Sequence, residues 1–487
     1  MQETKEKSIQ LTPSQQRAFD KFIEFLTNDT KVFILKGYAG TGKTTLLKSF
    51  IRELQKRKEE FKLLASTGRA AKIIRDITGA PASTIHSMLY VFTDLNQDLD
   101  KIYENDKEQP KMDNTGQLLL NFDMVEADNQ NYSRCFYIVD ESSMISDKAE
   151  ENPTQAVFGS GKTLYDLLHY DSKGKFIFVG DNCQLPPVRE KESPALSPEY
   201  IQINYGMKCV DAELTNIVRQ DKKNGIVMAS KRVRELFQSP FKPKWPLFPL
   251  KGTPNIKIGA SQIDVLDKYI NNLKSDGYES STLICRSNSE CAKFARFIRP
   301  ALGFHGLLAV NDLLIVTQNN GLSGFVNGDM VKVTQLGMTT TAANLTFQLV
   351  EVEEVVTKRR FSQLLILDIL SSNLTNLSTT QQKGLYIDFF FRMKNKGIKQ
   401  KSPVFKDNMR TDPYLNALRV NYGYALTCHK AQGGEWSNVY VNIPNFLPPD
   451  INATEYQWLY TAMTRATKNL HIIDMYNRTT QNPDIHS

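Results

Sequence analysis

The sequence lacks several features that would restrict where and how the protein works. It has no run of 18 apolar residues, so we expect no membrane-spanning helix. The first ten residues, MQETKEKSIQ, contain no apolar stretch, which predicts a cytoplasmic protein without a signal peptide. The six cysteines form no CxxC pair and the six histidines are scattered, which predicts reduced thiols and no zinc site.

Charge is unevenly distributed along the chain, and acidic residues are concentrated in one segment. The chain has 60 Lys and Arg against 53 Asp and Glu. Residues 91–130 contain ten acids and three bases, so this segment carries −7 and the rest of the chain +14. Such an excess favours a polyanionic partner, although ordinary solvated lysines explain the charge alone equally well.

Length and composition predict a globular protein of several domains. The 487 residues suggest about three domains at about 150 residues each. Short apolar runs followed by polar residues alternate with amphipathic helical patterns in two separate parts of the chain, which is typical of α/β domains with parallel sheets. The expected strands are 32–35, 62–66, 136–141 and 175–181 in the first part, and 281–288, 424–433, 439–443 and 469–474 in the second. A helix is expected over 44–58.

Two segments interrupt this alternation and predict inserts. The acidic segment is one, and the other contains three expected antiparallel strands at 331–336, 346–356 and 363–370, which favours a small SH3-like β-barrel. The predicted organisation is a first RecA-like domain (1–88 and 132–212) with a hairpin or wedge insert (89–131), and a second RecA-like domain (213–310 and 411–487) with the barrel insert (311–410).

GYAGTGKT (37–44) matches the phosphate-binding pattern GxxxxGK[ST] between an expected strand and an expected helix. Its glycines let backbone N–H groups turn toward phosphates at a helix N-terminus. The Lys43 ammonium would bridge the terminal phosphates, and the Thr44 hydroxyl would bind Mg²⁺. The predicted nucleotide contacts in this loop are Gly37, Ala39, Gly40, Thr41, Gly42, Lys43, Thr44 and Thr45.

FYIVDESS (136–143) supplies an acidic pair at the end of an expected strand. Asp140 would hold Mg²⁺ through water, and Glu141 would polarise the attacking water. A carboxylate beside the metal indicates hydrolysis of ATP rather than simple binding of it.

The ordered series of further motifs resembles the superfamily 1B DNA helicases, the group that includes RecD, the Dda helicase and the Pif-type helicases. The segments that carry this resemblance are LTPSQQRAF (11–19), ASTGRAA (65–71), STIHSML (83–89), GDNCQLPPV (180–188), LTNIVRQ (214–220), FVNGDMVKV (325–333), TCHKAQGGEW (427–436) and LYTAMTRAT (459–467). Leu185, Pro186 and Pro187 in the fourth segment resemble the 1B pattern, which implies 5′-to-3′ movement on single-stranded DNA. The resemblance also implies a cytoplasmic, monomeric motor in DNA replication, repair or recombination.

The resemblance assigns roles to residues across the cleft between the two α/β domains. Arg219 and Arg465 would reach the γ-phosphate when the domains close, and arginines that arrive late stabilise the transition state. Gln184 would sense phosphate and DNA together. Gln15 would contact the adenine edge, and Glu435 the ribose hydroxyl.

A second set of residues is predicted to hold DNA. Thr67, Gly68 and Arg69 follow a strand end in the first domain, and Thr427, His429 and Lys430 occupy a comparable place in the second. His86 would add a contact, although a plain core histidine is an alternative. Tyr90, Phe92 and Trp436 are candidates for base stacking, and each fits core packing equally well.

Three other functions compete with a helicase that unwinds forked or tailed duplexes. A DNA-stimulated translocase would strip or remodel protein–DNA complexes with little strand separation. A nucleotide-binding scaffold would have no use for the hydrolytic set of Glu141, Arg219 and Arg465. A P-loop kinase would not need the second α/β domain.

Overall fold

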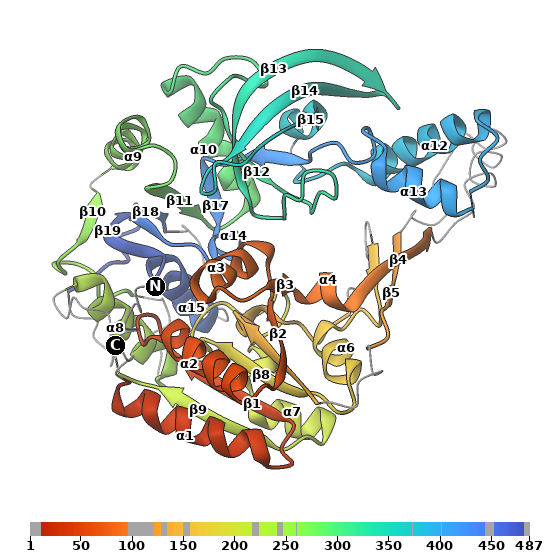
Figure 1. Cartoon of the computed structure of the whole chain (residues 1–487). Coiled ribbons are helices and arrows are strands. Elements are labelled where there is room, and N and C mark those ends of the chain that lie inside the picture. The colour runs from red at the N-terminus through yellow and green to blue at the C-terminus, as the bar shows by residue number, and fades with distance from the viewer. Residues whose placement is uncertain are drawn as a thin grey trace, which may run out of the picture.

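The computed structural model shows how the predicted elements assemble (Figure 1). It describes residues 11–95, 120–127, 134–149, 156–216, 224–240, 247–259, 261–372, 374–400, 402–443 and 452–481. Within these ranges, no helix is both long enough and apolar enough to cross a membrane.

The first α/β unit is built on a six-stranded parallel sheet. Its order is β3 (Ala82–Thr84), β2 (Glu60–Ala65), β6 (Cys135–Asp140), β8 (Lys175–Gly180), β1 (Val32–Gly37) and β9 (Cys209–Leu214). Both faces of a parallel sheet must be covered, so its strands are apolar on both sides. In β1, Phe33 and Leu35 contact one core and Val32 and Ile34 the other.

Six helices cover the two faces of this sheet. The helices α1 (Pro13–Thr27), α2 (Lys43–Lys56) and α3 (Gly68–Thr78) pack on one face. The helices α4 (Ile85–Leu89), α6 (Thr163–Tyr170) and α7 (Pro198–Tyr205) pack on the other. Two short 3₁₀ turns, η1 (Ser142–Met144) and η2 (Pro194–Leu196), follow β6 and β8.

A three-stranded sheet extends from the first unit after α4. β4 (Tyr90–Leu95) and β5 (Leu120–Met124) form an antiparallel pair, and β7 (Ala156–Phe158) joins β5 in parallel. The predicted insert (89–131) therefore contains a hairpin formed by β4 and β5. Residues 96–119, which contain most of the acids, lie outside the described ranges.

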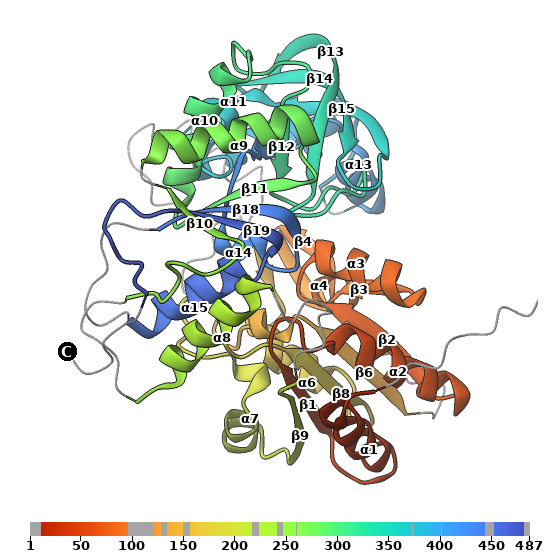
Figure 2. The same ribbon diagram turned by 90° about the vertical axis from the view of Figure 1, so that its left-hand side faces the viewer.

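The second α/β unit has a five-stranded parallel sheet. Its order is β10 (Ile256–Gly259), β19 (Ala466–Ile473), β18 (Trp436–Asn442), β11 (Ser281–Cys285) and β17 (Ala425–Thr427). The helices that pack with it are α8 (Gly225–Gln238), α9 (Gln262–Asp276), α10 (Asn288–Ala301), α14 (Cys428–Ala431) and α15 (Asn452–Met463). Figure 2 shows α8 and α15 between this sheet and the first unit.

The inserted β-structure is a five-stranded antiparallel sheet. Its order is β15 (Arg360–Ile366), β14 (Leu345–Glu354), β13 (Met330–Ala342), β12 (Leu313–Val316) and β16 (Val420–Tyr422). Leu418, just before β16, forms a bridge to Leu365 in β15, so the two edge strands meet and the sheet closes. The structure thus contains the expected barrel, while its SH3-like character stays a prediction.

Part of the predicted barrel segment is helical, which corrects the sequence analysis. The expected strand 363–370 ends at Ile366, and α11 (Leu367–Ser371) follows directly. The Asp368 carboxylate accepts a hydrogen bond from the Thr346 N–H at 2.7 Å, which holds this turn against the start of β14. Two further helices, α12 (Thr379–Asn395) and α13 (Pro403–Thr411), were not predicted and project beside β4 and β5 (Figure 1).

Candidate active site

The GxxxxGK[ST] segment forms a tight loop between β1 and α2. Gly40 and Gly42 have φ of 77° and 78°, a left-handed conformation that side chains disfavour. A Cβ at Gly37 would lie 2.9 Å from both the Lys43 side chain and the Thr41 hydroxyl. The Lys43 ammonium donates to the Gly37 carbonyl at 2.6 Å, so it lies across the loop that would hold phosphates.

Gln15 is buried against this loop. It belongs to a capping box that starts α1, in which the Thr12 N–H donates to the Gln15 Oε1 at 2.9 Å. Its Nε2 donates to the Thr41 and Gly42 carbonyls at 3.2 and 3.3 Å. These contacts connect α1 to the phosphate loop, whereas the predicted adenine contact stays a prediction.

The acidic pair lies at the carboxyl end of β6, next to the loop. Glu141 adopts φ of 51°, a left-handed conformation that is strained for a residue with a side chain. Burial and the neighbouring Glu141 carboxylate raise the pKa of Asp140. The Glu141 Oε2 is buried without a hydrogen-bond partner in the structure. Two adjacent carboxylates in this setting form a site that favours a cation.

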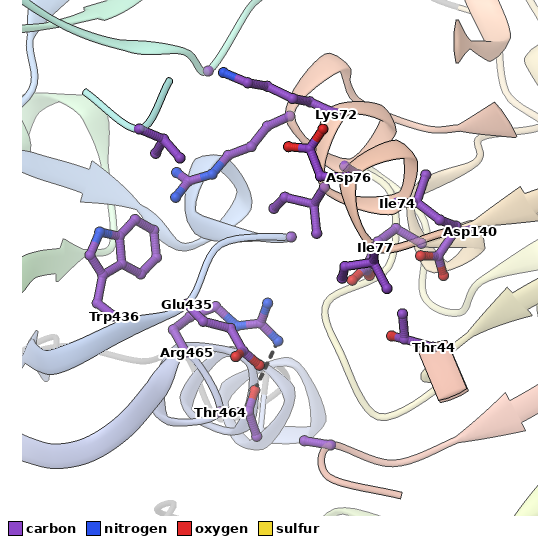
Figure 3. A pocket seen from close by; sticks show the side chains of 18 of the residues that line it. Thr44, Lys72, Ile74, Asp76, Ile77, Asp140, Glu435, Trp436, Thr464 and Arg465 are labelled. Carbon is purple, nitrogen blue, oxygen red and sulfur yellow. Dashed lines mark hydrogen bonds between the residues drawn. The ribbon is translucent and has the colours of Figure 1, made fainter. Parts of the chain in front are cut away.

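Residues of the second α/β unit face the loop and the acids across a cavity of about 530 Å³. Figure 3 shows Thr44 and Asp140 on one side of it and Glu435, Thr464 and Arg465 on the other. The Arg465 guanidinium donates to the Thr461 carbonyl at 3.1 Å and to the Thr464 hydroxyl at 3.2 Å. Among the predicted residues, Ala39, Gly40, Gly42, Lys43, Thr44, Thr45, Asp140, Glu141, Gln184, Glu435 and Arg465 line this cavity.

Arg219 is the predicted catalytic residue that cannot be placed, because residues 217–223 lie outside the described ranges.

The chain between Gly180 and Val188 is hydrogen-bonded to α15 of the second unit. The Leu185 N–H donates to the Thr461 hydroxyl at 2.9 Å, and the Gln457 side chain donates to the Gln184 carbonyl at 3.2 Å. Gln432 donates to the Leu185 carbonyl at 3.2 Å. This segment is therefore positioned to transmit movement between the two units.

Tyr460 joins the phosphate loop to the same segment. Its hydroxyl donates to the buried Asp181 carboxylate at 2.7 Å and accepts from the Ala39 N–H at 3.1 Å. Burial first, and then the Asp181 charge, raise the pKa of Tyr460 far above its ordinary value, so the phenol stays protonated. Sequence analysis missed this residue, although LYTAMTRAT contains it.

The predicted DNA contacts in the first unit have mixed placements. The Thr67 hydroxyl caps α3 by accepting from the Ala70 N–H at 3.2 Å. Gly68 is covered by Val326, since a Cβ on Gly68 would lie 2.2 Å from the Val326 side chain. Arg69 lines the nucleotide-side cavity with its guanidinium 4.6 Å from the Trp436 ring.

Two aromatic candidates make packing contacts within the protein. Trp436 is buried under Arg69, which agrees with the alternative of core packing. Phe92 contacts Phe122 with ring centroids 5.6 Å apart and packs against the core of α12 and α13. Tertiary contacts thus use both rings for core packing.

His86 lies in an aromatic cluster at the base of β4. Its ring is 5.5 Å from Tyr90 and 5.2 Å from Phe158. Burial lowers the pKa of His86, so the ring is neutral near pH 7. These contacts agree with the alternative of a packed histidine.

The predicted DNA contacts of the second unit lie around α14. Thr427 and Lys430 line a second cavity of about 520 Å³, together with Arg296 of α10. Burial lowers the pKa values of His429 and Lys430. Arg69 and Lys430 therefore line different cavities in this arrangement, and the predicted pair of DNA clamps stays a prediction.

Comparisons with known proteins match both α/β units. Residues 10–236 match the family model of an AAA domain, and residues 422–473 match the UvrD-like helicase C-terminal domain. The first match contains the phosphate loop and the acidic pair, and the second contains Glu435 and Arg465. A segment is also 30% identical over 184 residues to the ATP-dependent DNA helicase Pif1 of Campylobacter jejuni, covering 37% of this chain and 34% of that protein.

The chain thus combines an AAA domain with a UvrD-like helicase C-terminal domain. These two domains agree with the helicase that the sequence analysis predicted.

Other similar proteins cover more of this chain. An uncharacterized protein of Acanthamoeba polyphaga mimivirus is 22% identical over 94% of this chain and 98% of its own length. An uncharacterized protein of Methanocaldococcus jannaschii is 26% identical over 94% of this chain, which spans 38% of that protein. Among solved structures, one of Pif1 helicases at forked double-stranded DNA covers 95% of this chain and 92% of that chain at 16% identity, with a TM-score of 0.49. The Candida albicans Pif1 helicase covers 98% of both chains at 16% identity, with a TM-score of 0.42.

Proposed function

We propose that the chain is a Pif1-like helicase of superfamily 1B, which hydrolyses ATP between its two α/β units and moves 5′ to 3′ on single-stranded DNA, separating duplex strands as it moves. The observation that carries the proposal is the shared cavity. It brings Lys43 and Glu141 of one unit opposite Arg465 of the other. A site divided in this way responds to closure of the cleft, so that chemistry is coupled to movement of one unit relative to the other.

The acidic pair and the Thr44 hydroxyl fit a magnesium ion. Oxygen ligands suit Mg²⁺. The unpartnered Glu141 Oε2 and the raised pKa of Asp140 both indicate negative charge that a cation would stabilise. Asp140 and Thr44 would hold the ion, which would neutralise charge on the β- and γ-phosphates.

The side chains around this site have separate roles in hydrolysis. Lys43 leaves the Gly37 carbonyl to bind the terminal phosphates. Glu141 orients and polarises the attacking water. Arg465 and Arg219 stabilise the charge that develops on the transferred phosphoryl group. Gln184 reports phosphate occupancy to α15 through its backbone bond to Gln457.

Thr427, His429 and Lys430 supply the DNA contacts of the second unit, and Thr67 supplies a contact in the first. We assign Arg69 to the nucleotide side, because its guanidinium stacks on Trp436 in that cavity. The direction of movement rests on the resemblance of Leu185, Pro186 and Pro187 to the 1B pattern.

Contacts of the β4–β5 hairpin favour strand separation over the alternative of a translocase that only remodels protein–DNA complexes. The Lys406 ammonium of α13 donates to the Thr93 carbonyl of β4 at 2.6 Å. Phe92 and Leu120 pack on the apolar core of α12 and α13. A hairpin that packs on α12 and α13 can resist the force of a duplex better than an isolated one.

Unwinding of duplexes with either a 5′ or a 3′ single-stranded tail tests the proposal. We expect strand separation with the 5′ tail only, and ATPase activity that rises with single-stranded DNA. The Lys43→Ala variant controls for contaminating activity. Unwinding from the 3′ tail would refute the direction, and DNA-stimulated ATPase activity without unwinding of either substrate would favour the translocase.

A further inference from the structure

The α12–α13 region concentrates positive charge. Residues 379–411 contain eight Lys or Arg and two Asp, while the whole chain has a formal net charge of only +7. Within 392–406 there are six basic residues and no acidic one. A solvated face normally mixes both signs, so this concentration needs an explanation beyond solubility.

The basic side chains of this region divide into bound and exposed groups. Arg392 is held by the Asp388 carboxylate at 2.8 Å and also pairs with Asp412, so it fixes α12 to the end of α13. Lys396 and Lys399, in the turn between the two helices, are exposed. Their charges therefore face solvent from a turn whose supporting helices are fixed.

This turn belongs to a support that contacts the hairpin. Phe405 and Met409 of α13 belong to the apolar core against which Phe92 and Leu120 pack. In Figure 1, α12 and α13 project away from the α/β units, above the ends of β4 and β5. The basic turn is thus held in a fixed place relative to the hairpin.

We propose that the α12–α13 turn binds the phosphates of duplex DNA next to the hairpin. The proposal rests on the proposed function, because the hairpin marks where the two strands would part. Lysines without base contacts bind phosphates irrespective of sequence. Residues 394–402 contain no aromatic side chain, so the turn lacks the stacking groups with which proteins hold single strands. Duplex DNA, whose bases are already stacked, fits this surface better.

Equilibrium binding of the full chain to a blunt-ended hairpin duplex and to a single-stranded oligothymidylate tests the proposal over a salt series. The test variant is Lys396→Gln/Lys399→Gln. The control is Lys268→Gln/Lys274→Gln, which removes the same charge from exposed positions of α9 on the opposite side of the molecule (Figure 1). Thermal melting of both variants checks that they fold. Lys396→Glu/Lys399→Glu should enlarge any effect.

We expect the test variant to lose about tenfold in duplex affinity near 0.1 M salt. The slope of the logarithm of its duplex binding constant against the logarithm of the salt concentration should fall in magnitude by about 2, because each lost phosphate contact removes about 0.9 from that slope. Its oligothymidylate affinity and its ATPase activity with that strand should equal those of the control. An equal loss for both DNAs would assign the turn to the single strand and overturn the proposal. Unchanged duplex binding would overturn it too. Failure of the proposed function is recognised separately, as an absence of DNA-stimulated ATPase activity in the unmodified chain.

Discussion

The Tyr460 hydroxyl connects the two α/β units at the phosphate loop. It donates a hydrogen bond to the Asp181 carboxylate and accepts one from the Ala39 N–H, and both Tyr460 and Asp181 are buried. A phenol is suited to this because it donates and accepts at one atom. The hydroxyl therefore links the loop conformation to the position of α15.

We expect Tyr460→Phe to lower DNA-stimulated kcat more than it changes nucleotide KM, because the loop and the acids remain while their connection to α15 is lost. The unpaired Asp181 and Ala39 groups should also cost about 1–3 kcal/mol of stability. Steady-state ATPase assays and thermal melting measure the two effects. Tyr456→Phe is the matched control, since Tyr456 lies on the same helix against Phe248. Equal effects of both substitutions would mean that Tyr460 acts by packing alone.

Lys43 and Glu141 should respond differently to substitution. Lys43→Ala should weaken both nucleotide binding and turnover. Glu141→Gln should leave binding largely intact and lower kcat by about 10²–10⁴, because an amide cannot polarise the attacking water. Fluorescent-nucleotide binding and ATPase assays in saturating DNA separate the two. A near-normal rate for Glu141→Gln would show that another group is the base.

Motif residues in the cleft could be predicted where short spacing fixes their geometry. Lys43 and Asp140 each follow a buried strand of one parallel sheet, so their meeting at one edge follows from the pattern. Arg69 and Trp436 could not be predicted in the same way. Their stacking depends on how the two units pack, and no local pattern records that.

At the scale of elements, strands with apolar faces were predicted well, and helices in the barrel segment were not. The strand expected over 363–370 wrongly included most of α11. The apolar side chains of Ile369 and Leu370 are compatible with a buried strand and with a buried helix, so the pattern did not distinguish the two. Helix signals for α12 and α13 were present: Ser378 with Gln381 forms a capping box, and Ser402 with Pro403 starts α13. They were missed because residues 311–410 were interpreted as one β-domain.

The hairpin gives a prediction at this scale. Shortening residues 94–117 to a short Gly/Ser turn should spare ATPase activity stimulated by single strands, since Lys43 and Arg465 lie in the cleft. It should lower duplex separation if the segment that joins β4 to β5 acts as the wedge that the sequence analysis predicts. The measurement is base pairs opened per ATP hydrolysed on a forked substrate. An unchanged ratio would place the strand-separating element elsewhere.

At the scale of the whole molecule, the barrel is tied to the first α/β unit beside the nucleotide cavity. The Lys72 ammonium of α3 lies 2.8 Å from the Glu354 carboxylate of β14. Burial alone would raise the pKa of Glu354, but hydrogen bonds from Lys72 and Thr357 outweigh it and hold this pKa below its ordinary value. The stability from Glu354 is therefore present above its unfolded-state pKa and is lost as the pH falls through the lower folded-state pKa.

Lys72→Met should cost about 1–3 kcal/mol, because it leaves the buried Glu354 carboxylate without its cationic partner. The double variant Lys72→Met/Glu354→Gln should recover most of that loss. Lys332→Met is the control, since Lys332 is 3.9 Å from Glu353 and more exposed, so its loss should stay below about 1 kcal/mol. Denaturant unfolding at neutral pH measures all three. If the stability losses caused by the two substitutions simply add in the double variant, the ion pair does not join the barrel to α3.

The closure of the barrel has a consequence for how this protein can diversify. The Ile366 N–H donates to the Leu418 carbonyl at 3.1 Å, so the chain leaves the sheet and returns to it at neighbouring positions. The segment between these two residues, which includes α12 and α13, is an insertion whose two ends lie next to each other. Insertions, deletions or exchanges within it need not alter the strand order around them. Substrate preference could thus change during evolution, or by grafting, while the ATP-hydrolysing machinery stays the same.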